Sequence, residues 1–194
     1  MGHQGRRCFD AFSNDRTSAC VHRLADATEA TIRMLSPEDR ESFLAGFERL
    51  SRESRYLRFF TAMPRLPDSM LHRLLSTDGT DHVALAAWCN GNADMIVGVA
   101  RFVRLRKGGD TAEAAVAVVD HMQRRGIAWL LLSHLAEAAR ERGILRFRAE
   151  VLSANHAVRA LLRDLVKATP VAVDGNIVYD VDVPAVKNTM TVAA

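Results

Sequence analysis

The hydrophobic and polar positions of this 194-residue chain follow helical spacing in some stretches and extended spacing in others. Residues 114–119 form a continuous apolar run that is short and rich in β-branched side chains, which predicts a buried strand. In residues 127–139 apolar side chains recur at helical spacing, ahead of charged residues 140–142 and Gly143, and this pattern predicts an amphipathic helix. The rest of the chain is organised around this strand, the turn after it and this helix.

The other apolar patterns predict short strands and helices in mixed order. Ser36 and Pro37 are typical of a helix start, because serine caps N–H groups there and proline suits the first helical position. Further helices are expected at 50–60, 68–76 and 154–164. Strands are expected at 29–35, 83–89, 95–105, 146–151, 170–173 and 176–183, with turns at 90–94, 107–110 and 174–175.

Length and composition indicate a single domain with an ample core, since 48% of the residues are hydrophobic and 25% are charged. We expect this domain at residues 29–183. Residues 1–28 are polar and lack clear periodicity, which predicts a flexible N-terminal extension. Residues 184–194 are expected to form a frayed C-terminal tail.

The turn between the central strand and helix has the sequence Gln-Arg-Arg-Gly-Ile-Ala at residues 123–128. Its two small residues, Gly126 and Ala128, allow a ligand to approach the backbone closely. A helix start also exposes unpaired N–H groups and the positive end of the helix dipole. The turn therefore suits a diphosphate group, and Arg124 and Arg125 add positive charge beside it.

These six residues match the Gln/Arg-x-x-Gly-x-Gly/Ala pattern of the GNAT superfamily of N-acetyltransferases. The context strengthens the resemblance, because a strand precedes the turn, a helix follows it, and Leu-Ser-Ala-Asn comes after the next strand at 152–155. From about residue 31 to residue 183 the chain resembles this family. The resemblance implies an α+β fold, a mixed central sheet flanked by helices and splayed at the acetyl-CoA strand. It also implies direct transfer of acetyl from the cosubstrate acetyl-CoA to an amine.

In the family, the pantetheine arm of acetyl-CoA pairs like an extra strand with the strand ahead of the turn. Here that role falls to backbone groups of Val116 and Val118. Asn155 matches an asparagine that contacts the same arm, although asparagine is also a common helix N-cap, and both roles are compatible. The resemblance assigns the cofactor to Val116, Val118, Gln123, Arg124, Arg125, Gly126, Ile127, Ala128 and Asn155.

Glu113 is the candidate catalytic base. An amine such as lysine has a reference pKa of ~10.4 and must lose a proton before it attacks a thioester. Glu113 interrupts an apolar strand, so we expect a partly desolvated carboxylate, which favours proton uptake. It also occupies the place of the catalytic glutamate in the lysine acetyltransferases that the chain resembles. The alternative is a strand-edge glutamate that faces water.

Two features depart from the family pattern or suggest other chemistry. Many members have a tyrosine that protonates the leaving thiolate, where this chain has Leu162, so the general acid is unassigned. Asp120 and His121 look like a catalytic pair, but neighbouring residues of a strand point to opposite faces, so we expect no relay. His134 is expected to be packed or exposed and not functional.

The segment Ser-Arg-Tyr-Leu-Arg-Phe-Phe at residues 54–60 resembles the acceptor-side helices of bacterial protein lysine acetyltransferases. Its apolar side chains are alternatively core residues beneath the sheet, and Arg55 and Arg58 are interpreted as surface charges. Because of the resemblance of this segment, protein lysine is the favoured acceptor. The alternatives are a small-molecule amine acetyltransferase and a non-catalytic CoA-binding sensor or interaction module. The acceptor, the acyl-chain preference and the oligomeric state are left open.

Composition narrows the partners further. The formal charge is +3 and the pI is near 9.0, but basic and acidic residues are interspersed, so we expect no nucleic-acid partner. No apolar run approaches the roughly 20 residues of a membrane span, and the N-terminus lacks the apolar centre of a secretory signal. We therefore expect a cytoplasmic protein with no membrane partner.

The three cysteines, Cys8, Cys20 and Cys89, are spaced unlike any zinc or redox motif, and we expect reduced thiols. Cys8, Cys20 and His22 are metal-ligand types, but they are scattered in a polar leader. The sequence accordingly predicts no metal site.

Overall fold

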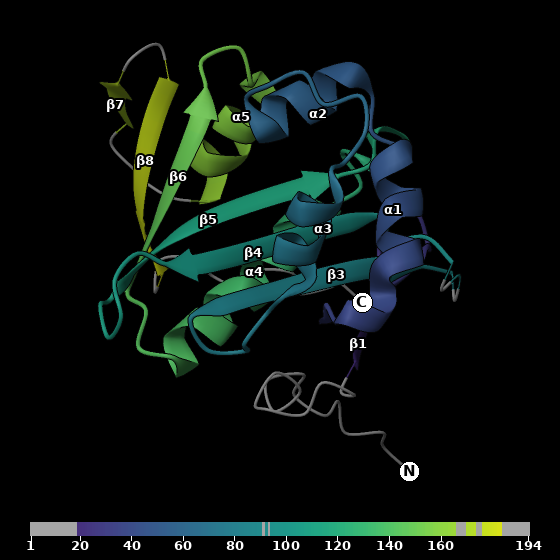
Figure 1. Ribbon diagram of the computed structural model, residues 1–194, viewed down its shortest axis with the longest axis horizontal. Coiled ribbons are helices and arrows are strands. Elements are labelled where there is room, and N and C mark those ends of the chain that lie inside the picture. The colour runs from purple at the N-terminus through teal and green to yellow at the C-terminus, as the bar shows by residue number, and fades with distance from the viewer. Residues whose placement is uncertain (1–18, 91, 93, 166–169, 174–175, 184–194) are drawn as a thin grey trace.

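The structure is a computed structural model that describes residues 19–90, 92, 94–165, 170–173 and 176–183. In these residues eight strands form one sheet, in the order β1-β2-β3-β4-β5-β6-β8-β7. Helix α4 (Ile127–Glu141) covers one face of the sheet, and α1 (Arg40–Glu48) and α3 (Asp68–Leu75) cover the other (Figure 1). This confirms the predicted α+β architecture with a mixed sheet flanked by helices.

The first five strands form an antiparallel meander. They are β1 (Ala19–Arg23), β2 (Glu29–Met34), β3 (His82–Cys89), β4 (Gly98–Arg104) and β5 (Thr111–Val118). The chain then crosses over through α4 to β6 (Arg146–Leu152), which is parallel to β5. The last strands, β7 (Pro170–Val173) and β8 (Asn176–Asp182), form an antiparallel pair, and β8 lies beside β6.

Strands β5 and β6 pair over three residues and then diverge. The paired residues are Thr111–Glu113 in β5 and Arg146–Arg148 in β6. Beyond Glu113 the two strands separate in a V, and helices α2 (Arg52–Phe59) and α5 (His156–Leu165) lie at its open end (Figure 1). The edge of β5 that faces β6 is therefore left unpaired by β6 from residue 114 onward, which confirms the predicted splay.

Most predicted elements are present with bounds shifted by a few residues. Ser36 and Pro37 begin a 3-10 turn, Pro37–Asp39, that leads into α1. The prediction of an unstructured extension at 1–28 is wrong for its last part, because Ala19–Arg23 form strand β1 and pair with β2. This strand is too short for its alternation to stand out. Residues 1–18, the expected turn at 174–175 and the expected tail at 184–194 lie outside the described residues.

The core has two layers, one on each face of the sheet. Strand β3 is buried along nearly its whole length, because α4 packs on one side of it and α1 and α3 on the other. Helix α1 approaches closely at Gly46, where a Cβ atom would lie 2.2 Å from the carbonyl oxygen of Ile96, so only glycine fits. This contact fixes the position of the C-terminal part of α1, from which the chain enters α2. None of the helices in the described part of the chain combines the length and apolar character needed to cross a membrane.

Candidate active site

The turn after β5 bends sharply and presents the start of α4. Gly126 is the N-cap of α4 with φ 89°, and Arg124 also has a positive φ of 60°. These left-handed conformations reverse the chain within a few residues. The N–H groups at the start of α4 consequently have no helical partner and are available to an anionic ligand.

A cavity of about 350 Å³ lies between this turn, α2 and α5, and we call it the cofactor cavity. Eight of the nine expected cofactor residues line it: Val116, Val118, Gln123, Arg124, Gly126, Ile127, Ala128 and Asn155. Arg125 does not, because its guanidinium group lies 3.0 Å from the Asp26 carboxylate in the loop between β1 and β2. The position of Arg125 therefore does not support its expected contribution to the diphosphate site.

Gln123 holds the turn together as well as lining the cavity. Its side-chain amide donates to the carbonyl of Val118, at 3.0 Å, and to the Ser54 hydroxyl, at 3.5 Å. Trp129, at the start of α4, also lines the cavity. Trp129 was not among the expected cofactor residues, although it directly follows the Gly-Ile-Ala segment of the turn.

Asp120 connects the same turn to α2. Its carboxylate accepts hydrogen bonds from the Ser51 N–H and hydroxyl, at 2.8 Å each, and from the Ser54 hydroxyl at 2.9 Å. Burial acts to raise the pKa of Asp120, but these hydrogen bonds outweigh it and lower the pKa below its ordinary value. Asp120 is therefore a clamp between α2 and the cofactor turn, a role that sequence reasoning missed because Ser51 is far away in the chain.

Asn155 is a helix N-cap whose side chain also borders the cavities. It is buried, and its side-chain oxygen accepts from the backbone N–H of Val158 at 3.1 Å, which caps the start of α5. The residue also lines the cofactor cavity and the cavity next to it. Capping thus fixes the side chain at the boundary between the two cavities.

A second cavity, of about 320 Å³, adjoins the first, and we call it the acceptor cavity. The two cavities share Leu57, Arg58, Val116, Asn155, Val158 and Leu161. Glu113 and Glu150 line the acceptor cavity. Glu113 is the last residue of β5 that pairs with β6, so its carboxylate stands where the strands part. The side chain is exposed, which differs from the expectation of partial desolvation.

Arg58 lines both of these cavities and a third, smaller one of about 50 Å³ beneath α1. Part of its side chain is accessible, but the guanidinium end is surrounded by protein. This burial lowers the pKa of Arg58, and the nearby Glu113 carboxylate opposes the shift. The interpretation of Arg58 as a surface charge is therefore wrong.

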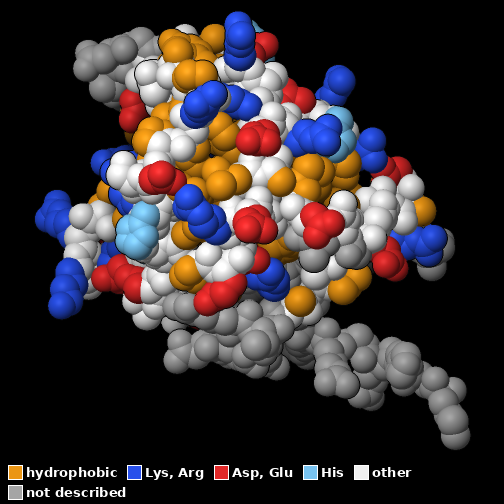
Figure 2. Space-filling view, turned by 45° about the vertical axis from the view of Figure 1, so that its right-hand side comes forward, with side chains coloured by type: hydrophobic (Ala, Val, Ile, Leu, Met, Phe, Trp, Pro, Cys, Tyr) orange, Lys and Arg blue, Asp and Glu red, His pale blue; other side chains and the backbone are white. Residues whose placement is uncertain are grey.

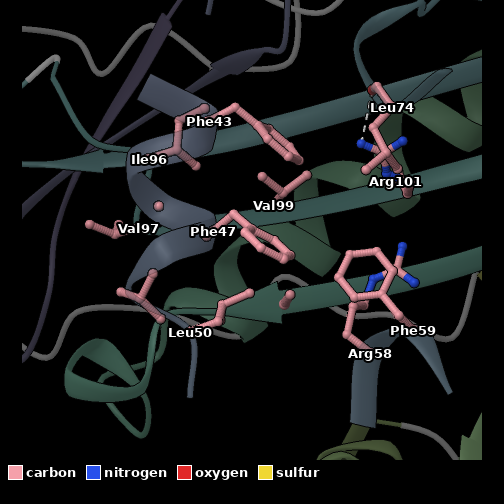
Figure 3. A pocket seen from close by; sticks show the side chains of 14 residues that line it. Phe43, Phe47, Leu50, Arg58, Phe59, Leu74, Ile96, Val97, Val99 and Arg101 are labelled. Atoms are coloured by element: carbon pink, nitrogen blue, oxygen red, sulfur yellow. Dashed lines mark hydrogen bonds between the residues drawn. The ribbon is translucent and has the colours of Figure 1, made fainter. Parts of the chain in front are cut away.

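Figure 3 shows the ring of Phe59 in α2 facing that of Phe47 in α1, with 6.0 Å between the two ring centroids. Beside them Arg101 donates to the carbonyl of Leu74 at 3.0 Å. Burial, together with the positive charges of Arg58 and Arg73, lowers the pKa of Arg101 to about 9. Arg58 and Arg73 line the acceptor cavity together with Glu113 and Glu150, whereas Arg101 lines the smaller cavity beneath α1.

Arg55 makes contacts within the protein and is not only a surface charge. It donates to the carbonyls of Pro64, at 2.7 Å, and Glu48, at 3.1 Å, and its guanidinium carbon lies 4.4 Å from the Phe47 ring centroid. These contacts hold the ends of the α2 segment together.

The apolar side chains of α2 are not core residues beneath the sheet. No residue of α2 is buried, and Tyr56 and the following Phe60 are 47% and 38% exposed. Leu57, Phe59 and Phe60 line the acceptor cavity. On the side of the molecule in Figure 2, apolar side chains reach the surface between interspersed acidic and basic ones.

Leu162, which stands in place of the family tyrosine, is buried and lines the acceptor cavity. The titratable side chains lining that cavity are Arg58, Arg73, Glu113 and Glu150. The described lining thus contains two carboxylates and no tyrosine, and the general acid stays unassigned.

Comparisons with known proteins agree with this arrangement. Residues 44–165 match the model of the acetyltransferase (GNAT) family. Acetyltransferase PA5475 of Pseudomonas aeruginosa is 30% identical over 142 residues, which cover 73% of this chain and 76% of that protein. Acetyltransferase Pat of Mycolicibacterium smegmatis is 34% identical over 156 residues, which cover 80% of this chain but only 46% of Pat.

Solved structures show the same likeness. The GNAT domain of S. lividans PAT superposes with a TM-score of 0.78 at 36% identity, covering 84% of this chain and 96% of that one. At 22% identity, the fold is shared with the Salmonella typhimurium yncA structure solved with acetyl-CoA, with a TM-score of 0.62 and 79% and 94% of the two chains covered. Because the family model spans more than half of its length, this chain belongs to the acetyltransferase (GNAT) family, and it is an acetyltransferase whose cosubstrate is acetyl-CoA.

Proposed function

We propose that this chain transfers acetyl directly from acetyl-CoA to the side-chain amine of a protein lysine. The observation that carries the proposal is the position of Glu113, at the vertex of the splayed strands and in a cavity that adjoins the cofactor cavity. Its likeness to acetyltransferase Pat and to the GNAT domain of S. lividans PAT supports the same class of reaction.

The cosubstrate spans from the turn to the split in the sheet. Its diphosphate binds the N–H groups at the start of α4, with Arg124 beside it and Arg125 turned away to Asp26. The pantetheine arm lies along the edge of β5 that β6 leaves unpaired, at Val116 and Val118. The side-chain oxygen of Asn155 caps α5, so the Asn155 amide nitrogen is the group that donates to the arm. The carbonyl of Val118 also accepts from Gln123.

The acceptor amine enters the acceptor cavity past Tyr56 and Phe60, whose exposed rings provide contact area for a protein segment. Glu113 takes a proton from the lysine ammonium, directly or through water. The neutral amine then attacks the thioester carbonyl carbon and forms a C–N bond. The C–S bond breaks, the CoA thiolate leaves and takes a proton from water, the nitrogen loses its second proton to solvent, and Glu113 returns its own proton to solvent.

Arginine side chains near Glu113 favour the first step. Arg58, Arg73 and Arg101 lie close enough to interact electrostatically with one another or with Glu113. Their positive charge disfavours an ammonium ion and acts to lower the pKa of a bound lysine. The carboxylates of Glu113 and Glu150 in the same cavity act in the opposite direction.

Steady-state acetyl transfer to a panel of lysine-containing proteins and small amines tests this proposal. For Glu113→Gln we expect kcat to fall by about 10²–10⁴-fold, as for loss of a general base. Acetyl-CoA affinity, followed by Trp129 fluorescence, should stay unchanged. Glu150→Gln is the matched carboxylate control in the same cavity, with a loss below about 10-fold expected.

Each contrary outcome has a distinct meaning. Turnover with small amines alone would replace protein lysine by a small-molecule acceptor. Binding of CoA without turnover of any amine would point to a sensor or interaction module. Equal rates for Glu113→Gln and the parent chain would remove Glu113 from its role, and a large loss in Glu150→Gln would transfer the role to that residue.

A further inference from the structure

Three side chains of metal-ligand type meet between β1 and α4, on the face of the sheet opposite α1 and α3 (Figure 1). Cys20 and His22 are two residues apart on β1 and so point to the same face. His134 reaches them from α4. One ligand atom from each of the three lies within 4.8 Å of the other two. From the sequence, Cys20 and His22 were possible ligands together with Cys8, which lies outside the described residues, and His134 was expected not to be functional.

The cluster is largely withdrawn from water. Cys20 and His134 are 1% and 2% exposed and His22 is half-buried, in surroundings made by the apolar core cluster that includes Ile32 and Leu131. The Nε2 atoms of His22 and His134 are 2.8 Å apart, so one ring donates its proton to the other. Polar rings and a thiol concentrated in an apolar layer cost free energy in comparison with aliphatic side chains.

Glu137, one helical turn after His134, completes the arrangement. Its carboxylate is buried and lies 3.5 Å from Nδ1 of His134. A carboxylate there favours the tautomer that carries the proton on Nδ1, which directs the Nε2 lone pair toward His22 and Cys20. Carboxylate–histidine pairs of this kind orient the ligands of metal sites in many proteins. Arg140 lies 4.0 Å from the other carboxylate oxygen of Glu137.

We propose that Cys20, His22 and His134 form a binding site for a thiophilic divalent cation of the Zn²⁺ type, with Glu137 orienting His134. One thiolate and two imidazoles are a ligand set that zinc accepts, with water in the fourth position. In a tetrahedral site these ligand atoms lie roughly 3.3–3.7 Å apart, from Zn–N near 2.0 Å and Zn–S near 2.3 Å. The observed separations bracket that range, so small side-chain rotations complete the site. On binding, the Cys20 thiol releases its proton to solvent and its sulfur bonds the metal. His22 changes tautomer, its proton moving through solvent from Nε2 to Nδ1, so that the Nε2 lone pairs of both histidines face the metal.

The consequence for the fold is a cross-link between the edge strand β1 and the central helix. Since His134 lies two turns into the helix whose first turn forms the cofactor site, the metal steadies that helix without taking part in acetyl transfer. Metal binding and acetyl-CoA binding are therefore separable.

The test titrates the full chain, first freed of metal by a chelator, with Zn²⁺ against a chromogenic competitor, and with Co²⁺ as a spectroscopic probe. We expect one metal per chain, a raised melting temperature, and a thiolate-to-cobalt charge-transfer band. His22→Ala and Cys20→Ser should each weaken Zn²⁺ binding by about 100-fold or more, and Glu137→Gln by about 10-fold. The double variant Cys8→Ser, Cys89→Ser is the control, with the band and the affinity retained.

Because His22 is half-buried on the edge strand, we expect His22→Ala to keep its fold even if Cys20→Ser or Glu137→Gln does not. Circular dichroism of each chain checks this. The proposal is overturned if the parent chain gives no charge-transfer band, if His22→Ala binds Zn²⁺ as tightly as the parent, or if the band disappears in the cysteine control instead.

Discussion

Asp120, just beyond the end of β5, accepts hydrogen bonds from both the backbone N–H and the hydroxyl of Ser51, each at 2.8 Å. Ser51 is itself the N-cap of α2, with its oxygen accepting from the Ser54 N–H. The carboxylate thereby places the N-terminus of α2, with its favourable dipole, against the cofactor turn. Since α2 contributes to the walls of both cavities, this one contact sets their relative position.

Replacement of Asp120 by alanine should loosen α2 from the turn. We expect a loss of about 1 kcal/mol in the free energy of unfolding, because the hydrogen bonds that Ser51 and Ser54 donate to the Asp120 carboxylate are removed. We also expect weaker acetyl-CoA binding, since α2 lines the cofactor cavity. Urea unfolding and calorimetry measure the two effects. Asp68→Asn, which breaks the exposed ion pair with Arg40, is the control and should change neither.

Replacement of Arg58 by methionine should shift the pH dependence of transfer to a lysine acceptor. Methionine keeps the apolar stem but removes the buried positive charge, so the bound amine deprotonates less readily. The rise of kcat with pH should move to higher pH, and Arg73→Met in the same cavity should move it less. A profile that coincides with that of the parent chain would exclude an electrostatic role for Arg58.

Replacement of Gly126 by glutamate should abolish acetyl-CoA binding, with an affinity loss above about 100-fold, or ~2.7 kcal/mol. The new side chain brings bulk and a like charge to the diphosphate position. Gly143→Glu is a matched control, because Gly143 also has a positive φ, of 69°, and has open space around it. Both variants carry similar backbone strain, so similar melting temperatures with unequal quenching of Trp129 would isolate the effect on the ligand.

His22 should make the metal-free protein less stable in weak acid. Burial, with the neighbouring His134 ring, lowers the pKa of His22 from 6.5 to about 4, although Glu137 acts in the opposite direction. Between these values the unfolded chain binds more protons than the folded one, so stability falls as the pH drops from 6.5 toward 4. Because His22 is only half-buried, we expect an effect of about 1–2 kcal/mol.

Unfolding of the parent chain and of His22→Gln at pH 7 and at pH 5, with chelator present, isolates this contribution from carboxylates that titrate at lower pH. In the folded parent chain the groups around the His22 ring are His134, Glu137 and Cys20, at pH 7 as at pH 5. An equal loss of stability in the two chains would contradict the prediction.

Periodicity in the sequence was enough for most elements of the fold. The central strand, the glycine turn and α4 follow from local patterns, because side-chain spacing, capping and positive-φ glycine act over a few residues. The same patterns overlooked β1, whose five residues become a strand only by pairing with β2. The splay came from resemblance to a family and not from any local signal.

The cofactor turn was also predicted in the main, since its chemistry is that of a helix start. Arg125 was not, because its partner, Asp26, is supplied by a distant loop. Arg58 was misjudged for a similar reason. An arginine on an amphipathic helix looks solvent-exposed until a second helix and a split sheet enclose its charged end.

What the sequence determined by itself is therefore what depends on neighbours along the chain: element type, the helix start that suits a diphosphate, and a glutamate, Glu113, ten residues before Gln123 of the turn. The tertiary structure decided which distant groups share a small volume, as with Asp120 and Ser51, or Cys20, His22 and His134. Electrostatic energies and metal coordination depend on separations of a few ångströms between such groups, and sequence distance carries little information about those separations.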